Sequence, residues 1–365
     1  MSLRKVISGP AFRAWVPLLV MLVLAGCSDK YPNSTLDPKT EFTTMIDNVF
    51  MTTVKWAVVV FVLVEGALVF AILKFRGKPS DPEPKQTHGN TTVEIVWTII
   101  PAVILALIAV PTIKGIFATA ENPEDALTIE VIGHQWWWEF QYPDSKVVTA
   151  SELHVPSGRK ISLFMRTADV LHSFWSPQLA SKRDVFPRRH TTLWFTAPDT
   201  GVYGGQCAEF CGEQHARMGF EIHVDTPEEF ERWVTDQQVG SPLINGGQVS
   251  PDSAAPADSA TQAARIGRDS LMARGTQVFI TGGCIACHAM VGTPMAGQVR
   301  MIGPNLTHVG SRRTLAGAMM PNTDENLARW LRDPQAVKPG TLMKLPRPLT
   351  EDEVQTLVAY LRAHQ

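Results

Sequence analysis

Two long apolar runs constrain the fold of this chain more than any other feature. Val54 to Leu73 and Val93 to Ile113 are each about 20 residues long, the length at which a helix crosses ~30 Å of hydrocarbon. The segment between them begins with the basic stretch Lys74 to Lys78, and short basic loops stay on the cytoplasmic side of a membrane. A hairpin buried in a soluble core would explain neither feature. We therefore predict a transmembrane helical hairpin over residues 40–118, with both ends on the extracytoplasmic side of a lipid bilayer.

The first 27 residues have the pattern of an export signal, with basic residues before and within an apolar region whose core runs from Val16 to Leu24. The apolar core ends in Leu24-Ala25-Gly26-Cys27, and small residues before a cysteine are typical of a bacterial lipoprotein cleavage site. Cys27 would then be the lipidated first residue of the mature chain and an auxiliary anchor. The alternative is an uncleaved anchor with an incidental cysteine. We predict a location in the bacterial inner membrane, with both mature termini on the periplasmic side.

Two carboxylates fall within the apolar runs. Glu65 lies near the middle of the first run, and Glu94 lies near the cytoplasmic start of the second. An ionisable side chain is costly in hydrocarbon and usually faces protein or water. Glu94 could instead be an interfacial carboxylate among the lipid headgroups, and Glu65 could be a neutral acid bonded to a neighbouring helix.

The composition of residues 119–236 is typical of an all-β sandwich. Short runs rich in β-branched and aromatic residues alternate with Gly, Pro, Asp and Ser, and ten tryptophans occur in the chain, three of them consecutive. The expected strands are Leu127–Gly133, Trp136–Tyr142, Glu152–Val155, Ile161–Met165, Thr191–Thr196 and Gly219–Val224.

The last third of the chain predicts a linker followed by an all-α domain. Residues 237–262 are dominated by Gly, Ser, Pro, Ala and Asp, which is typical of a flexible linker. Residues 263–365 contain three amphipathic helical patterns, at Arg265–Phe279, Thr323–Leu331 and Thr350–Ala363, and the last opens with a capping box, Thr350-Glu-Asp-Glu353. The whole chain carries 33 basic against 35 acidic residues, so nucleic acid is not expected as a partner. The chain is thus predicted to be a multidomain membrane protein.

A dense set of soft metal ligands occupies one segment of the predicted sandwich. Cys207 and Cys211 are followed by His215 and Met218, and His172 lies upstream. Thiolate, imidazole and thioether together suit copper, whereas zinc rarely uses methionine. Two thiolates can also bridge two metal ions, which leaves one histidine for each. The alternatives are a disulfide between the two cysteines and a tetrahedral zinc site of two Cys and two His.

This segment resembles subunit II of the haem–copper cytochrome c oxidases. The resemblance is carried by Cys-x-Glu-x-Cys-x-x-x-His-x-x-Met over 207–218, preceded by Gly201-Val-Tyr-Gly-Gly-Gln206. It is also carried by Gly133-His-Gln-Trp-Trp-Trp138 and by Thr92-Val-Glu-Ile-Val-Trp-Thr-Ile-Ile-Pro-Ala102, and the match runs from about residue 40 to 225. It implies a cupredoxin fold that carries a binuclear copper centre, CuA, on a two-helix anchor.

The resemblance also implies a role for each matching residue. Cys207 and Cys211 would bridge both coppers, and His172 and His215 would bind one copper each. Met218 and the carbonyl of Glu209 would be the axial ligands, and the Glu209 side chain would reach a magnesium ion shared with subunit I. Trp136 would be the residue at which electrons enter, and Glu94 would stand at the mouth of a proton channel.

A second cofactor site is predicted near the C-terminal end. Cys284-Ile-Ala-Cys287-His288 is typical of covalent haem c attachment, with the histidine as axial ligand, although a redox dithiol could have the same spacing. Gly303-Pro304-Asn305-Leu306 resembles the class I cytochrome c loop whose proline carbonyl accepts the histidine N–H. Met343 is the expected sixth ligand. The other candidates for that role are Met319, Met320, Met290, Met295 and Met301. Trp330 is expected to pack on the haem edge or to bond to a haem propionate.

The domain order resembles subunit II of a caa-type oxidase with a fused cytochrome c. We expect an external cytochrome c or another respiratory donor to reduce the haem, and the electron to pass through the copper pair to subunit I. There, in a complex that also includes subunit III, oxygen is reduced to water with proton translocation. The chain lacks the histidine cluster for oxygen reduction and should not consume oxygen alone. The alternatives are the electron-input subunit of a nitric-oxide-reducing complex, a copper electron-transfer lipoprotein and a zinc-stabilised scaffold.

Overall fold

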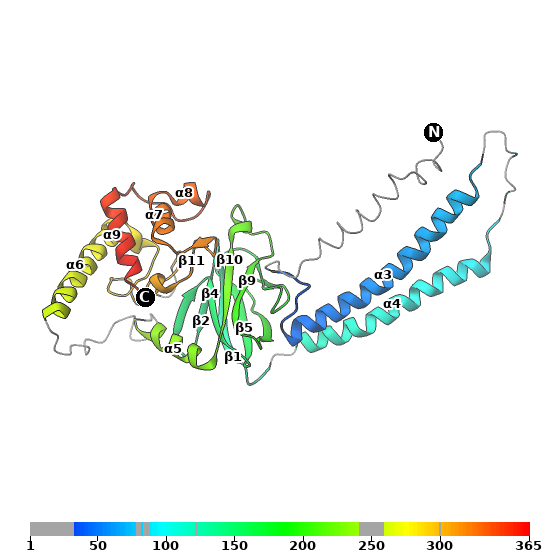
Figure 1. Cartoon of the computed structure of the whole chain (residues 1–365), viewed down its shortest axis with the longest axis horizontal. Helices are drawn as coiled ribbons and strands as arrows, with labels where there is room; N and C mark the ends of the chain where they lie inside the picture. The colour runs from blue at the N-terminus through cyan, green and yellow to red at the C-terminus, as the bar shows by residue number, and fades with distance from the viewer. Residues whose placement is uncertain are drawn as a thin grey trace, which may run out of the picture.

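The computed structural model describes residues 33–77, 82, 86, 88–120, 123–240, 259–298 and 301–365. Three parts follow one another in space as they do in the sequence: a pair of long helices, a β-sandwich and a helical C-terminal domain (Figure 1). This architecture confirms the predicted fold class. The predicted lipidation site, Cys27, and most of the predicted linker lie outside the described residues.

The paired helices are long enough to cross a membrane. Helix α3 (Glu41–Lys74) has 34 residues and helix α4 (Thr91–Ala120) has 30, and both are strongly apolar. Their apolar side chains are largely exposed, as expected for surfaces that face lipid. Pro101 and Pro111 lie inside α4 without ending it. The two helices lie side by side along much of their length (Figure 1).

The start of α3 is attached to the sandwich. Thr40 caps the helix, accepting a hydrogen bond from the Thr43 amide, and its own hydroxyl donates to the carbonyl of Leu179 at 2.8 Å. Phe42 is buried and meets Trp194 edge to face, with ring centroids 5.6 Å apart. These contacts fix where the membrane hairpin joins the domain that carries the metal ligands.

Two five-stranded sheets form the sandwich. Their strand orders are β3-β2-β1-β5-β8 and β4-β10-β9-β6-β7. The core between them is rich in aromatic rings, and Trp138, Phe174 and Phe220 contact one another there. The strands are β1 (Leu127–His134), β2 (Trp137–Tyr142), β3 (Val147–Ala150), β4 (Glu152–Pro156), β5 (Lys160–Thr167), β6 (His172–Trp175), β7 (Arg183–Val185), β8 (Thr191–Thr196), β9 (Gly201–Cys207) and β10 (Gly219–Asp225).

Four of these strands, β3, β6, β7 and β9, are absent from the sequence prediction. β6 and β7 are short, and β9 contains three glycines, so none shows a clear strand pattern. Gly205 in β9 lies directly against the ring of Phe220, where a side chain would collide with it. The glycine therefore allows an aromatic ring to pack onto the strand that leads into the metal-ligand loop.

A helix that the sequence prediction omitted closes one end of the sandwich. α5 (Pro227–Gln238) buries Phe230 and Val234 in the sandwich core. It opens with a capping box in which Thr226 and Glu229 bond to each other's backbone amides. The Thr-x-x-Glu pattern was therefore an available signal for this helix.

The C-terminal domain is built mainly from helices. α6 begins at Ser259, inside the predicted linker, and packs against α9 where Gly275 lies on the ring of Tyr360. The capping box predicted at Thr350 is present, with Glu353 as its partner. The elements are α6 (Ser259–Thr281), α7 (Asp324–Arg332), α8 (Pro334–Val337), α9 (Glu351–Arg362) and the short strands β11 (Thr314–Leu315) and β12 (Met320–Pro321).

Candidate metal and haem sites

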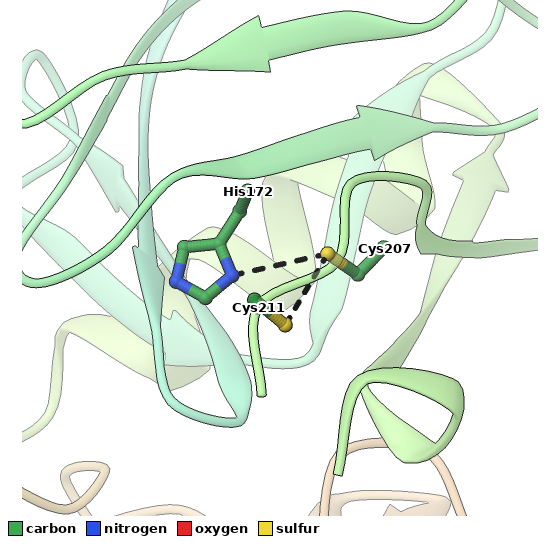
Figure 2. A group of neighbouring side chains, drawn as sticks. All are labelled: His172, Cys207 and Cys211. Atoms are coloured by element: carbon green, nitrogen blue, oxygen red, sulfur yellow. Dashed lines mark hydrogen bonds between the residues drawn. The ribbon is translucent and has the colours of Figure 1, made fainter. Parts of the chain in front are cut away.

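The sulfur atoms of Cys207 and Cys211 form the centre of the candidate metal site. They lie 3.8 Å apart, both cysteines are free, and His172 Nδ1 lies 3.8 Å from the Cys207 sulfur (Figure 2). Candidate ligand atoms of these three buried residues all lie within 4.8 Å of one another. The geometry leaves the sulfurs unbonded to each other and available to a metal.

The remaining predicted ligands surround the same sulfur pair. His215 Nδ1 lies 3.7 Å from the Cys211 sulfur, and the thioether sulfur of Met218 lies 3.9 Å from it. The carbonyl oxygen of Glu209 lies 3.3 Å from the Cys207 sulfur. The structure thus brings together all six residues predicted as metal ligands. Each of the two cysteine sulfurs has one imidazole beside it.

The strands explain how distant residues meet here. Phe174 in β6 pairs with Cys207 at the end of β9, so His172, two residues earlier, arrives beside the loop that carries the cysteines. The loop then turns through a short 3-10 helix, His215–Arg217. Met218 follows, and its carbonyl accepts the amide of Cys207 at 3.0 Å, which closes the loop.

The sequence reasoning missed one residue that orients a ligand. Asp169 Oδ1 lies 2.8 Å from His172 Nε2, so the other ring nitrogen faces the sulfur pair. Burial acts to raise the pKa of Asp169, but hydrogen bonds from His172 and from the Gln135 amide outweigh it and hold the pKa below its usual value. A carboxylate on the outer nitrogen is the usual way to fix a metal-binding imidazole. Its only sequence signal was its place three residues before His172.

The sulfur atoms of Cys207 and Cys211 are within hydrogen-bond distance of each other. This contact lowers the pKa of Cys207 to about 3 and raises the pKa of Cys211. Metals bind thiolates, so metal binding at this pair would release thiol protons. The donor set of two sulfurs, two imidazoles and a thioether fits copper.

Trp136 is joined to the metal-ligand loop. Its indole N–H donates to the carbonyl of Cys211 at 3.1 Å, and the side-chain amide of Gln135 donates to the same carbonyl at 2.8 Å. Trp136 is only 9% exposed, because the C-terminal domain lies against it. The indole therefore lies between the candidate ligand Cys211 and the candidate haem cavity.

That second site is a cavity between the C-terminal domain and the sandwich. Its empty volume is about 1330 Å³, part of it open to solvent, and apolar side chains line much of it. Trp136 and Trp137 of the sandwich form part of its wall. The residues predicted to hold haem all line it: Cys284, Cys287, His288, Pro304, Trp330 and Met343.

His288 is held in the geometry expected of a haem ligand. Its Nδ1 lies 2.8 Å from the carbonyl of Pro304, so this nitrogen is the donor and Nε2 is free to bind iron. Burial lowers the pKa of His288, which favours the neutral ring that metals bind. Gly303 packs directly on the ring, where any side chain would overlap it.

The competing methionines occupy other places. Met343 lines the cavity, whereas Met320 is buried in β12 and its sulfur accepts a hydrogen bond from Arg329 at 3.4 Å. Met319 faces a different surface depression beside α7 and α8. Of the methionines in residues 270–298 and 301–365, only Met343 belongs to the cavity lining.

The two membrane carboxylates lie in the hairpin, away from the sandwich ligands. Glu94 is exposed in the first turn of α4. Glu65 lies in a groove between α3 and α4, together with Ile104 and Ile108 of the second helix. The structure therefore does not bring either residue into the candidate metal site.

A second polar cluster lies on the outer face of β4 and β10. Candidate ligand atoms of Glu152, His154 and His223 lie within 4.8 Å of one another. The two imidazoles are stacked, 4.4 Å apart and 17° from parallel, and His154 bonds to Asp225 at 2.8 Å. Stacked rings do not point their lone pairs at a common ion, so we interpret this cluster as structural.

Comparison with known proteins identifies the domains in which these candidate sites lie. The profile of "Cytochrome C oxidase subunit II, transmembrane domain" matches residues 31–114, that of the periplasmic domain matches residues 147–225, and that of cytochrome c matches residues 272–365. A solved structure, the periplasmic domain of cytochrome oxidase subunit II from Bradyrhizobium japonicum, is 34% identical and covers 32% of this chain and 96% of that chain, with a TM-score of 0.31.

Two curated relatives match nearly the whole chain. Cytochrome c oxidase subunit 2 of Alkalihalophilus pseudofirmus is 36% identical over 361 residues, which cover 96% of each chain. The protein of the same name from Bacillus sp. (strain PS3) is 31% identical over 361 residues, with 94% of each chain covered. This chain is therefore a membrane protein of the cytochrome c oxidase subunit II family that carries a cytochrome c domain at its C-terminal end.

Proposed function

We propose that this chain takes electrons from an external cytochrome c or another respiratory donor and delivers them to subunit I of an oxidase. The haem c and the copper pair, when bound, supply one-electron transfer in that order. Oxygen reduction to water and proton translocation then belong to the complex with subunits I and III. The observation that carries the proposal is the unbonded sulfur pair with one imidazole beside each sulfur.

The donor arrangement favours two metal ions over the alternatives. A disulfide would place the sulfurs at about 2.05 Å, and here they are 3.8 Å apart. A tetrahedral zinc site would use two cysteines and two histidines as ligands, and would leave Met218 and the Glu209 carbonyl uncoordinated. Two bridged copper ions use all six donors. The family assignment likewise favours an oxidase over a nitric-oxide-reducing complex, a lone copper lipoprotein or a scaffold.

Residues around the two sites have separate tasks in this proposal. Asp169 orients His172, and Pro304 fixes the proton of His288 on the nitrogen that faces away from iron. Trp136, bonded to the Cys211 carbonyl, lies on the route between the haem cavity and the copper ligands. The largely apolar cavity wall would limit contact between a bound haem and water, which keeps the solvent rearrangement small when the charge changes. Met343 is assigned as sixth haem ligand, and Trp330 packs at the haem edge.

Other assignments come from the family resemblance and extend the proposal to the membrane. Glu94 would accept protons at the mouth of a channel continued in subunit I, and the Glu209 side chain would bind a magnesium ion shared with that subunit. The basic loop places the hairpin turn in the cytoplasm. The sandwich and the cytochrome domain would then lie on the periplasmic side, with Cys27 as a lipid anchor. We keep 40–118, 119–236 and 263–365 as the proposed domains, with the linker between the last two. Helix α4 runs to Ala120 and α6 begins at Ser259, so these helices extend slightly past the proposed boundaries.

An electron paramagnetic resonance spectrum of the oxidised chain tests the proposal. One electron shared equally by two copper nuclei splits the signal into seven lines, whereas one isolated copper gives four. Metal analysis should accompany the spectrum, with two coppers and one haem expected per chain. A single zinc ion and no copper would contradict the assignment and favour a scaffold. Oxygen consumption by the purified chain without subunit I would contradict it as well.

A further inference from the structure

Lys338 lies in the segment between α8 and Met343, and it is buried where the two soluble domains meet. Its side chain is 2% exposed, and its ammonium donates to three backbone carbonyls: Trp136 at 3.1 Å, Arg217 at 2.8 Å and Ala316 at 2.8 Å. Two of these carbonyls belong to the sandwich, called here the copper domain, and the third belongs to the cytochrome domain. All three ammonium hydrogens are therefore used, and two of them are used across the interface.

Two of the carbonyls that Lys338 binds, those of Arg217 and Trp136, belong to residues beside the candidate copper ligands. Arg217 immediately precedes Met218 in the ligand loop. Trp136 bonds through its indole to the carbonyl of Cys211. The contact with Lys338 thus reaches both the ligand loop and the tryptophan that lies between the two sites.

Neighbouring hydrogen bonds extend the same contact. The amide of Gly219 donates to the carbonyl of Gly317 at 2.9 Å, and the side chain of Gln214 donates to the carbonyl of Pro339. A second contact is made by the buried carboxylate of Glu152, which accepts the amides of Arg313 at 2.7 Å and Thr314 at 2.8 Å. Each of these bonds joins one domain to the other.

We propose that Lys338 is a positioning residue that holds the cytochrome domain docked on the copper domain, with Trp136 enclosed between the haem cavity and the copper ligands. A buried ammonium is costly unless its hydrogens are bonded, and two of its three acceptors exist only when the domains are together. Undocking would therefore expose the ammonium to water and leave those two carbonyls without it. The inference rests on the proposed function, since it assigns the haem and copper sites to these domains.

One consequence concerns where an external donor binds. In the docked arrangement Trp136 is 9% exposed, so a soluble protein donor cannot reach it directly. The donor must instead deliver its electron to the cytochrome domain. The fused domain thus occupies the position on the copper domain at which a separate donor would otherwise approach Trp136.

Hydrogen–deuterium exchange on the full haem- and copper-loaded chain tests the proposal. The amides of Gly219 and Thr314 donate hydrogen bonds across the interface, so they report docking. In Lys338→Met we expect both to exchange about tenfold faster or more, because a buried contact that holds the domains is lost. Lys160→Met, which changes an exposed lysine at the start of β5, should leave both rates as in the unmodified chain.

Amides that bond within one domain separate undocking from unfolding. Glu221 donates to Ser151 inside the copper domain, and Leu306 donates to Ala289 inside the cytochrome domain. Their exchange should not change in Lys338→Met. If the Gly219 and Thr314 rates also stay unchanged while haem and copper are retained, Lys338 does not hold the domains and the proposal is overturned.

A second variant decides the matter if Lys338→Met does not assemble with haem. Glu152→Ala removes the other contact and leaves Lys338 in place. The Thr314 amide should then exchange faster while the Gly219 amide stays protected. Equal acceleration at both amides would show that Lys338 alone does not keep the Gly219 contact closed, and would refute its assigned role. Exchange measures docking rather than electron flow, so failure here differs from an absent seven-line copper signal, which would refute the proposed function.

Discussion

The sulfur atoms of Cys207 and Cys211 lie 3.8 Å apart, each with a histidine nitrogen within 3.8 Å, at the end of β9 and in the loop that follows it. That separation is too long for a disulfide and leaves both sulfurs open to metal. The main chain here is held by the sandwich, because the Cys207 amide donates to the Met218 carbonyl and the Ala208 amide donates to the Ser173 carbonyl. A ligand loop held by such backbone bonds keeps small the rearrangement that accompanies electron transfer.

Replacing one bridging sulfur should destroy the copper pair without disturbing the haem. In Cys207→Ser we expect the seven-line paramagnetic signal to disappear, because a hydroxyl does not replace a bridging thiolate. The haem absorption spectrum should persist. Cys284→Ser is the matched change at the other site and should give the opposite result. Retention of the seven-line signal in Cys207→Ser would remove this residue from the ligand set.

The axial methionine can be identified from the haem potential. Met343→Leu should lower the reduction potential on the order of 0.1 V or more, since axial ligands set haem potentials over a range of about 0.8 V. Met320→Leu serves as the control, because Met320 lies in β12 and outside the cavity lining. The measurement is a spectroscopic redox titration of the full chain. A large shift in the control, with none in Met343→Leu, would reverse the assignment.

Asp169 should tune copper binding without touching copper. Asp169→Asn keeps the size of the side chain but removes the carboxylate that orients His172. Loss of such a partner typically weakens metal affinity by about 10–100-fold. Competition between the chain and a copper chelator measures this change. Asp184→Asn, at an exposed position in β7, should leave the affinity unaltered, and an equal loss there would point to a general charge effect.

The histidine stack should make the copper domain less stable in acid. Burial lowers the pKa of His154 below its ordinary value of 6.5, although the bond to Asp225 acts to raise it. His223 and Glu152 also lie beside the His154 ring. The folded domain therefore binds fewer protons than the unfolded chain, so stability is highest above pH 6.5 and falls as the pH drops through the folded-state pKa. The melting temperature should fall between about pH 7 and pH 5.

A pair of variants isolates this contribution. His154→Gln should reduce the difference in melting temperature between the two pH values, because the titrating ring is gone. His190→Gln, which changes an exposed histidine, should preserve the full difference. If both variants behave like the unmodified chain, another group is responsible for the acid sensitivity.

The sequence alone determined the features that depend on local composition and spacing. Hydrocarbon thickness sets the length of a membrane helix, so the apolar runs predicted α3 and α4. Ligand chemistry depends on residue type, so the Cys-His-Met spacing indicated a copper loop and Cys-x-x-Cys-His indicated haem attachment. A helix cap is a local hydrogen-bonded pattern, and Thr350 was predicted as one for that reason.

Only the tertiary structure decided which distant residues meet. His172 reaches the sulfur pair because β6 pairs with β9, and neither strand shows a clear pattern in the sequence. Asp169 gains its role from that same placement. Lys338 and Trp136 are 202 residues apart, and nothing local to either indicates that one binds the other. Such contacts follow from how domains and sheets pack, a property of the whole chain that no short window of residues contains.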